Sequence, residues 1–209
     1  RAREKGNVEE ERKPDAQMAP PPRQMRRLAV FLALSTFTSA LIHTANSFIP
    51  LLMVDHFEAS KETAAGALAL LYSSGFWANP LGGYLADRIG SVRVILGVCL
   101  IAAPTVYLIT AVPYGWALGA LFIIMGFVVF ARMSASEAYV VRRAPAANRS
   151  SILGIYFFAS QEGGALLTPV MGYMIDRFGF TMTYGIAGGA LLLMTLVCSF
   201  WLWEDTKQR

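Results

Sequence analysis

Charged residues are scarce in this sequence. Only 15% of its 209 residues are Asp, Glu, Lys or Arg, whereas soluble domains carry about 25%. Residues 1–27 hold 13 of these 32 residues, so uncharged runs such as 94–131 and 178–203 remain in the rest of the chain. A soluble core does not require such runs, but a lipid bilayer does. The composition therefore excludes an ordinary soluble domain, and the 55% hydrophobic content excludes a disordered chain.

Cysteine is also scarce, and the motifs of the common cofactor sites are absent. Cys99 and Cys198 each lie inside an apolar run, so no disulfide framework or metal site is predicted. The sequence has no P-loop, no H-E-x-x-H and no glycine-rich dinucleotide turn, and we expect no cofactor. Its basic residues separate apolar segments instead of forming a stripe with aromatic residues, which argues against a nucleic-acid partner.

The apolar segments are long enough to cross a bilayer. A hydrocarbon core about 30 Å thick requires roughly 20 helical residues. We predict an all-α membrane protein with a cytoplasmic linker or tail at 1–27, a six-helix transmembrane bundle at 28–203 and a cytoplasmic C-terminal tail at 204–209. The six predicted transmembrane helices are 28–53, 63–86, 94–111, 116–141, 151–175 and 181–203.

The basic residues predict the orientation of these helices. Cytoplasmic loops are rich in Lys and Arg, and ten basic residues lie near helix ends on one side against two on the other. We therefore expect a multi-pass protein of the plasma (inner) membrane with both termini in the cytoplasm. The ten are Arg23, Arg26, Arg27, Arg88, Arg93, Arg142, Arg143, Arg149, Lys207 and Arg209, and the two are Lys61 and Arg177.

Two eleven-residue segments repeat each other. Segments 80–90 and 169–179 match at six of eleven positions, without a gap. The first segment ends the second predicted helix and the other ends the fifth. Three helices separate them, so the two copies would lie on opposite faces of the membrane. This pattern predicts an inverted 3+3 repeat, which is typical of secondary transporters.

The first copy continues into Gly83-Tyr-Leu-Ala-Asp87-Arg88-Ile-Gly90-Ser-Val-Arg93. This stretch resembles the loop motif of the major facilitator superfamily, G-x-x-x-D-R/K-x-G-R-R/K, although Ser91 and Val92 depart from it. The resemblance implies half of a twelve-helix transporter that works by alternating access. Residues 1–27 resemble the linker between the halves and the chain starts at Arg1 instead of Met, so we expect the C-terminal half. Its expected partners are the lipid bilayer, a small-molecule substrate and a preceding N-terminal six-helix half of the same chain, or else a second copy.

The resemblance also implies a conformational gate, made of Gly83, Asp87, Arg88, Gly90 and Arg93. Gly83 is expected to let the second and third helices approach closely. Asp87 is expected to cap the helix that begins near Ser91. Arg88 and Arg93 are expected to pair with acidic groups or lipid headgroups.

Ionisable residues inside a bilayer are functional candidates. Arg132 and Glu162 lie ten and thirteen residues from the nearest cytoplasmic arginines, which places both near the midplane. We expect Arg132 to hold an anionic group of the substrate and Glu162 to bind and release a proton. The pair predicts proton-coupled symport of an organic anion. The alternative is a buried structural pair. Glu137 lies closer to the cytoplasmic end and about 140° around the helix from Arg132.

Other polar residues are candidate neighbours of this substrate site. Ser35, Ser39, His43 and Asn46 share one face of the first predicted helix, and Gln161 precedes Glu162. His43, Asn46 and Gln161 are predicted to contact the substrate. Asn46 and Gln161 are explained equally well as hydrogen-bonding residues between helices, and the alternative for His43 is a histidine whose hydrogen bonds a neighbouring helix satisfies.

Two further classes of protein remain as alternatives to a transporter. The first is a standalone six-span receptor or assembly protein without transport, which the same fold allows. The second is an intramembrane enzyme, which needs a nucleophilic serine in a glycine-rich turn and a nearby base. Here Ser73-Ser74-Gly75 lacks the preceding glycine, and His43 is the only histidine inside a predicted helix. We therefore do not expect catalysis.

Overall fold

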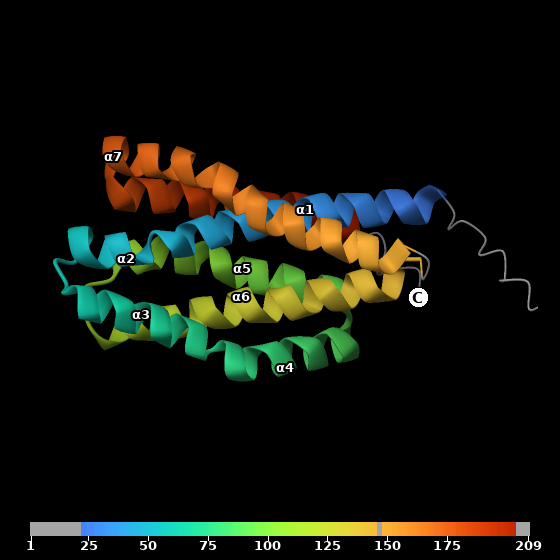
Figure 1. Ribbon diagram of the computed structural model, residues 1–209, viewed down its shortest axis with the longest axis horizontal. Coiled ribbons are helices and arrows are strands. Elements are labelled where there is room, and N and C mark those ends of the chain that lie inside the picture. Colours follow the sequence, from blue (N-terminus) through green and yellow to red (C-terminus); the bar gives the residue numbers. More distant parts are fainter. Residues whose placement is uncertain (1–21, 146–147, 204–209) are drawn as a thin grey trace, which may run out of the picture.

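The computed structural model describes residues 22–145 and 148–203, and every element in these two ranges is helical (Figure 1). Most of the predicted linker (1–21) and the predicted C-terminal tail (204–209) lie outside the described residues. The first helix begins at Pro22, six residues before the predicted membrane span. The elements are α1 (Pro22–Ser47), α2 (Ile49–Leu51), η1 (Leu52–His56), α3 (Lys61–Ser73), α4 (Gly75–Leu85), η2 (Ala86–Gly90), α5 (Ser91–Ala111), α6 (Trp116–Arg143) and α7 (Arg149–Trp203).

Four helical stretches in this part of the chain are long and apolar enough to cross a membrane: Leu28–His56, Lys61–Ala111, Trp116–Arg143 and Arg149–Val197. The two longest are not continuous rods. Gly90 has φ 93° at the start of α5, and Gly179 has φ 77° inside α7. Side chains disfavour such positive φ values, and glycine does not. In Figure 1 the chain reverses direction after α4 and again within α7. The structure therefore confirms membrane-length helices, and every element of the described residues is helical.

Local sequence explains how the helices start and why they continue. The Ser60 hydroxyl accepts a hydrogen bond from the Thr63 backbone N–H at 3.3 Å and so caps α3. Helices continue through Pro80, Pro104 and Pro169. In membrane helices, neighbouring groups can satisfy the carbonyls that proline leaves free. The three prolines therefore do not end their predicted spans.

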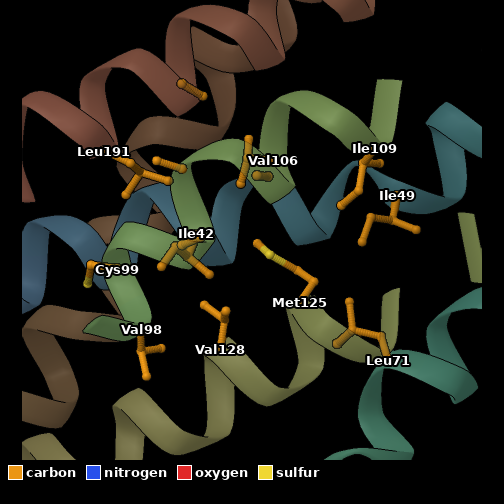
Figure 2. Packing of buried hydrophobic residues seen from close by; sticks show 14 of the residues in the cluster. Ile42, Ile49, Leu71, Val98, Cys99, Val106, Ile109, Met125, Val128 and Leu191 are labelled. Carbon is orange, nitrogen blue, oxygen red and sulfur yellow. The ribbon is translucent and has the colours of Figure 1, made fainter. Parts of the chain in front are cut away.

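The buried core lies where α1, α5 and α6 meet. Figure 2 shows Ile42 of α1, Val98 and Val106 of α5, and Met125 and Val128 of α6 converging on one another. All five side chains are at least nine-tenths buried. Helix α5 also packs along α7. The first helix, α1, and the last helix, α7, are therefore both held against the central helices α5 and α6.

Close backbone contacts join α3 and α4 to α6. A Cβ on Gly126 would meet the Leu71 carbonyl oxygen, and a Cβ on Gly82 would lie 2.6 Å from the Ala131 Cα. Small residues allow this approach because a side chain would force the helices apart. The expected close approach at Gly83 is wrong, since a Cβ there would meet nothing within 4 Å. Its neighbour Gly82 makes the contact, with α6 instead of α5.

The outer surface is strongly apolar. Phe76 is 95% exposed and Trp116 is 89% exposed, and large hydrophobic side chains on α5 and α7 are also exposed. Soluble monomers rarely expose contiguous apolar surfaces of this kind. The long apolar helices and their apolar surface agree with an integral membrane protein.

Candidate functional site

The Arg132 side chain is buried between α6 and α1, with 5% of its surface exposed. One terminal guanidinium nitrogen donates to the Ser39 hydroxyl at 2.7 Å. The other donates to the Ser35 carbonyl at 3.3 Å and lies 3.5 Å from the Ser35 hydroxyl. The helical spacing of Ser35 and Ser39 places both on the α1 face that meets α6, so the predicted polar stripe holds the arginine.

The hydrogen bonds of Arg132 extend to a third helix. The Ser35 hydroxyl lies 3.0 Å from the Ser136 hydroxyl of α6 and 3.4 Å from the Tyr156 hydroxyl of α7. We call Arg132, Ser35, Ser39, Ser136 and Tyr156 the arginine network. Sequence analysis missed its members Ser136 and Tyr156. The spacing of four between Arg132 and Ser136, which places both on one helix face, was the available signal.

No carboxylate in the described part of the chain pairs with Arg132. Its Nε is buried and has no hydrogen-bond partner among the described residues. Glu162 is exposed on α7 and forms no ion pair with Arg132, so the alternative of a buried structural pair is wrong. The acceptors of the Arg132 guanidinium are neutral serine oxygens, so no described partner balances its positive charge. The arrangement is chemically suited to an anion.

The other predicted substrate residues lie on α1 and α7. His43 is exposed, and its Nδ1 would be 3.3 Å from a Cβ on Gly164. Asn46 is buried, and its side-chain oxygen has no partner among the described residues. Gln161 is exposed beside Glu162 on α7. The structure therefore joins Arg132 to the serines of the α1 stripe. Among the described residues, no hydrogen bond joins the arginine network to the other four predicted residues, which are His43, Asn46, Gln161 and Glu162.

The predicted gate lies where η2 meets the end of α6. The Asp87 carboxylate forms an ion pair with Arg142, and both side chains are largely exposed. The expected cap by Asp87 is wrong, because α5 begins after Gly90 without a side-chain cap hydrogen bond. The carboxylate binds Arg142 instead and thereby joins two helix ends. Arg93 is exposed and has no ion pair among the described residues.

The two copies of the repeat share local structure. Gly90 and Gly179 both have positive φ, and each ends its copy. In the first copy the Arg88 guanidinium lies over the Tyr84 ring at 5.1 Å. In the second, Arg177 donates to the Tyr173 hydroxyl at 3.0 Å. The matching Tyr and Arg positions therefore interact in both segments, through a ring contact in the first and a hydrogen bond in the second.

Comparison with known proteins gives two findings. Residues 28–209 match the family model of the Major Facilitator Superfamily. Curated proteins of two Mycobacterium tuberculosis strains, each named "Probable nitrate/nitrite transporter NarK2", are 31% identical to this chain over 160 residues. The matched region is 75% of this chain and 37% of each relative. The chain therefore matches little more than a third of the length of these relatives.

Proposed function

Because the chain belongs to the major facilitator superfamily, a family of membrane transporters, we propose that it is the C-terminal six-helix half of a secondary active transporter for a small anion. The family match covers 28–209, and the chain is an integral membrane protein with several membrane-length helices. The transport cycle is alternating access, in which two halves rock about a site near the midplane.

Two glycine breaks support six spans in an inverted repeat. As a single rod, the 55 residues of α7 would be about 80 Å long, far more than the roughly 30 Å hydrocarbon core. Division at Gly179 gives two segments of membrane length. Gly90 divides the stretch Lys61–Ala111 in the same way. With α1 and α6, the division yields six spans.

The distribution of basic residues supports cytoplasmic termini in the plasma membrane. The start of α1, the segment η2, the end of α6 and the start of α7 lie toward the same end of the bundle (Figure 1). Arg88, Arg142 and Arg149 belong to this end. Cytoplasmic loops carry the excess of basic residues, so we assign this end to the cytoplasm.

A single observation carries the anion class. Arg132 is 5% exposed, has no carboxylate partner among the described residues and keeps a buried Nε without an acceptor. A small oxyanion or carboxylate would supply that acceptor and balance the charge. The names of the relatives, which refer to nitrate and nitrite, point to the same class. Glu162, His43, Asn46 and Gln161 remain candidates for the wall of the transport pathway.

The ion pair of Asp87 and Arg142 supports a role for the η2 loop in gating. It joins the cytoplasmic ends of α4 and α6 through two exposed side chains. An exposed ion pair contributes about 0–1 kcal/mol to stability, so it can break and re-form during a transport cycle. Gly83, Arg88, Gly90 and Arg93 belong to the same gate in this proposal.

Uptake by proteoliposomes tests the function. The full-length protein is reconstituted, and uptake of nitrate, nitrite and a panel of small carboxylates is measured with and without a proton gradient. We expect saturable accumulation of at least one anion. Binding without accumulation would favour the receptor alternative instead.

Arg132→Lys tests the role of the arginine. Lysine keeps the charge but loses the planar fork, so we expect a KM at least tenfold higher for the transported anion. Arg149→Lys, at an exposed position on α7, is the matched control and should transport like the wild type. An unchanged KM in Arg132→Lys would exclude anion binding by this residue.

A further inference from the structure

Ser160 of α7 has a buried hydroxyl group that forms no hydrogen bond with any described residue, and only 7% of the residue is exposed. Hydroxyl side chains inside a helix commonly donate to the backbone carbonyl one turn earlier. Three threonines of the same helix do so, namely Thr168, Thr183 and Thr195. Ser160 does not donate to the Tyr156 carbonyl in this way. A buried hydroxyl without a partner is unfavourable, so this hydroxyl is available to a ligand.

Two contacts fix the register between α1 and the first part of α7, which pack along each other. The Tyr156 hydroxyl lies 3.4 Å from the Ser35 hydroxyl, and the two residues are 121 positions apart. About two turns further along both helices, a Cβ on Gly164 would lie 3.3 Å from the His43 Nδ1. His43 and Gly164 have the same separation in the sequence as the first pair. The two helices therefore run parallel and stay in register between these contacts.

Ser39 and Ser160 lie midway between the two contacts and share this register. Each is one turn from the contacting residue on either side, so each belongs to the same helix face as its neighbours. The helices are close at this level, because a Cβ on Gly163 would lie 3.2 Å from the Ala40 Cβ. Ser160 is therefore opposite the α1 serine whose hydroxyl accepts a hydrogen bond from Arg132 at 2.7 Å.

The unsatisfied groups of Arg132 and Ser160 are both able to donate a hydrogen bond. The Arg132 Nε–H is buried without an acceptor, and the Ser160 hydroxyl is buried without a partner of either kind. The two groups do not bond each other in this structure. An anion with two or more oxygens can accept from both at once, and hydrogen bonds to a charged acceptor are stronger than those to a neutral one.

We propose that Ser160 is a further binding residue for the transported anion, and that its hydroxyl donates to one anion oxygen while Arg132 holds another. The proposal rests on the transport function proposed above, and the ligand class is an oxyanion or carboxylate. Arg132 and Ser160 are 5% and 7% exposed, so the anion reaches them when α7 moves away from α1. Closure of the contact then shields the bound anion from water. Gln161 and Glu162, the predicted residues of this turn, are exposed instead.

Stabilisation of the full-length protein by an anion measures this binding, because a ligand of the folded state raises the unfolding temperature. The protein is purified in detergent, and potassium nitrate, nitrite or acetate replaces potassium chloride at constant ionic strength. We expect at least one of the three anions to raise the unfolding temperature of the wild type. In Ser160→Ala, the concentration of that anion needed for half of the effect should be at least fivefold higher.

Thr195→Val is the matched control. It also removes a buried hydroxyl of α7, but one that donates to the Leu191 carbonyl of its own helix at 2.7 Å. We expect this variant to respond to the anion like the wild type. In proteoliposomes, Ser160→Ala should likewise raise the KM for that anion at least fivefold and keep the maximal rate within twofold, whereas Thr195→Val should change neither.

The unfolding temperature without the added anion separates binding from a structural role. Ser160→Ala removes a buried hydroxyl that has no partner, so it should unfold at the wild-type temperature or above it. A lower unfolding temperature or a failure to fold would show that the hydroxyl supports the packing, and would overturn the proposal.

Two further results would overturn the assignment of Ser160. The first is an unchanged anion response in Ser160→Ala. The second is an equally weakened response in Thr195→Val, which would show a general effect of hydroxyl loss in α7. A wild-type protein that none of the three anions stabilises, and that transports none of them, would instead refute the proposed function and the role of Ser160 with it.

Discussion

At the Arg132 guanidinium, oxygens of two serines occupy the positions where a buried arginine usually meets a carboxylate. Ser39 supplies a hydroxyl, and Ser35 supplies both a hydroxyl and a carbonyl. Neutral acceptors satisfy the donors without cancelling the charge. No described residue supplies a counter-charge to this guanidinium, which is the chemical basis for the anion that we propose at this position.

Removal of one of these acceptors should destabilise the protein. In Ser39→Ala, one buried guanidinium nitrogen loses its acceptor at 2.7 Å. We expect the free energy of unfolding to fall by about 1–3 kcal/mol, measured by denaturation in detergent. Ser47→Ala is the control, because the exposed Ser47 hydroxyl donates only to a carbonyl of its own helix. Equal effects of the two substitutions would contradict the role of Ser39.

The sequence revealed Arg132 but not its neighbours, for a physical reason. A charge inside an uncharged run is unfavourable in a bilayer, so it stands out in any sequence. Serine and tyrosine are tolerated in membrane helices with or without partners, so Ser136 and Tyr156 carry no comparable signal. The burial of Arg132 and the exposure of Glu162 depend on how three helices pack, which one sequence does not reveal.

Among the elements, α4 and α6 have the closest backbone contact next to the gate. A Cβ on Gly82 would lie 2.6 Å from the Ala131 Cα and 2.8 Å from its carbonyl oxygen. One residue further along, a Cβ on Gly83 would meet nothing within 4 Å. The contact therefore depends on Gly82, which lies outside the loop motif that begins at Gly83.

The neighbouring glycines provide a matched pair of substitutions. Gly82→Ala should lower the free energy of unfolding by about 1–3 kcal/mol, because α4 must move away from α6. Gly83→Ala should leave it unchanged or raise it by up to about 1 kcal/mol, since alanine favours a helix. Denaturation of the two variants in detergent measures the difference. A larger loss in Gly83→Ala would place the close contact at Gly83 after all.

Helix positions were predictable to within a few residues, whereas their irregular segments were not. Helix α5 ends at Ala111 and helix α6 begins at Trp116, both as predicted. Pro113 and Gly115 interrupt the apolar pattern between them. The π-helical segments η1 and η2 had no sequence signal. Each contains an ordinary mixture of residues and ends at a loop or at Gly90, so its geometry follows from packing.

For the whole molecule, reagent accessibility tests the proposed six spans. Single cysteines are placed at Tyr114, Asn148 and Phe178 in a background without Cys99 and Cys198. We expect Tyr114→Cys and Phe178→Cys to react with an impermeant thiol reagent in intact cells. Asn148→Cys should react only after permeabilisation.

This expectation follows from the break at Gly179, because α7 reverses at the opposite end of the bundle from its start (Figure 1) and Phe178 directly precedes that break in the sequence. Reaction of Phe178→Cys and Asn148→Cys from the same side would exclude a reversal at Gly179. Reaction of Tyr114→Cys from the cytoplasmic side would show that the chain has the orientation opposite to the one proposed.

Helical class and family were recognisable from the sequence because they depend on hydropathy and on one short motif. The family match over 28–209 confirms the resemblance. The substrate, the coupling ion and the roles of the gate residues stay predictions. They depend on distances of a few ångströms between side chains far apart in the sequence.

The contact between α4 and α6 also has a consequence for biosynthesis. Ser74 and Asn79 form hydrogen bonds with Ile123 and Ser134, which follow them by 49 and 55 residues in the chain. A ribosome that feeds the helices into the membrane in order delivers α3 and α4 well before α6. Until α6 arrives, the glycines and polar groups of α4 face lipid or the insertion machinery. Insertion of α6 therefore supplies the partners of Ser74, Asn79 and Gly82.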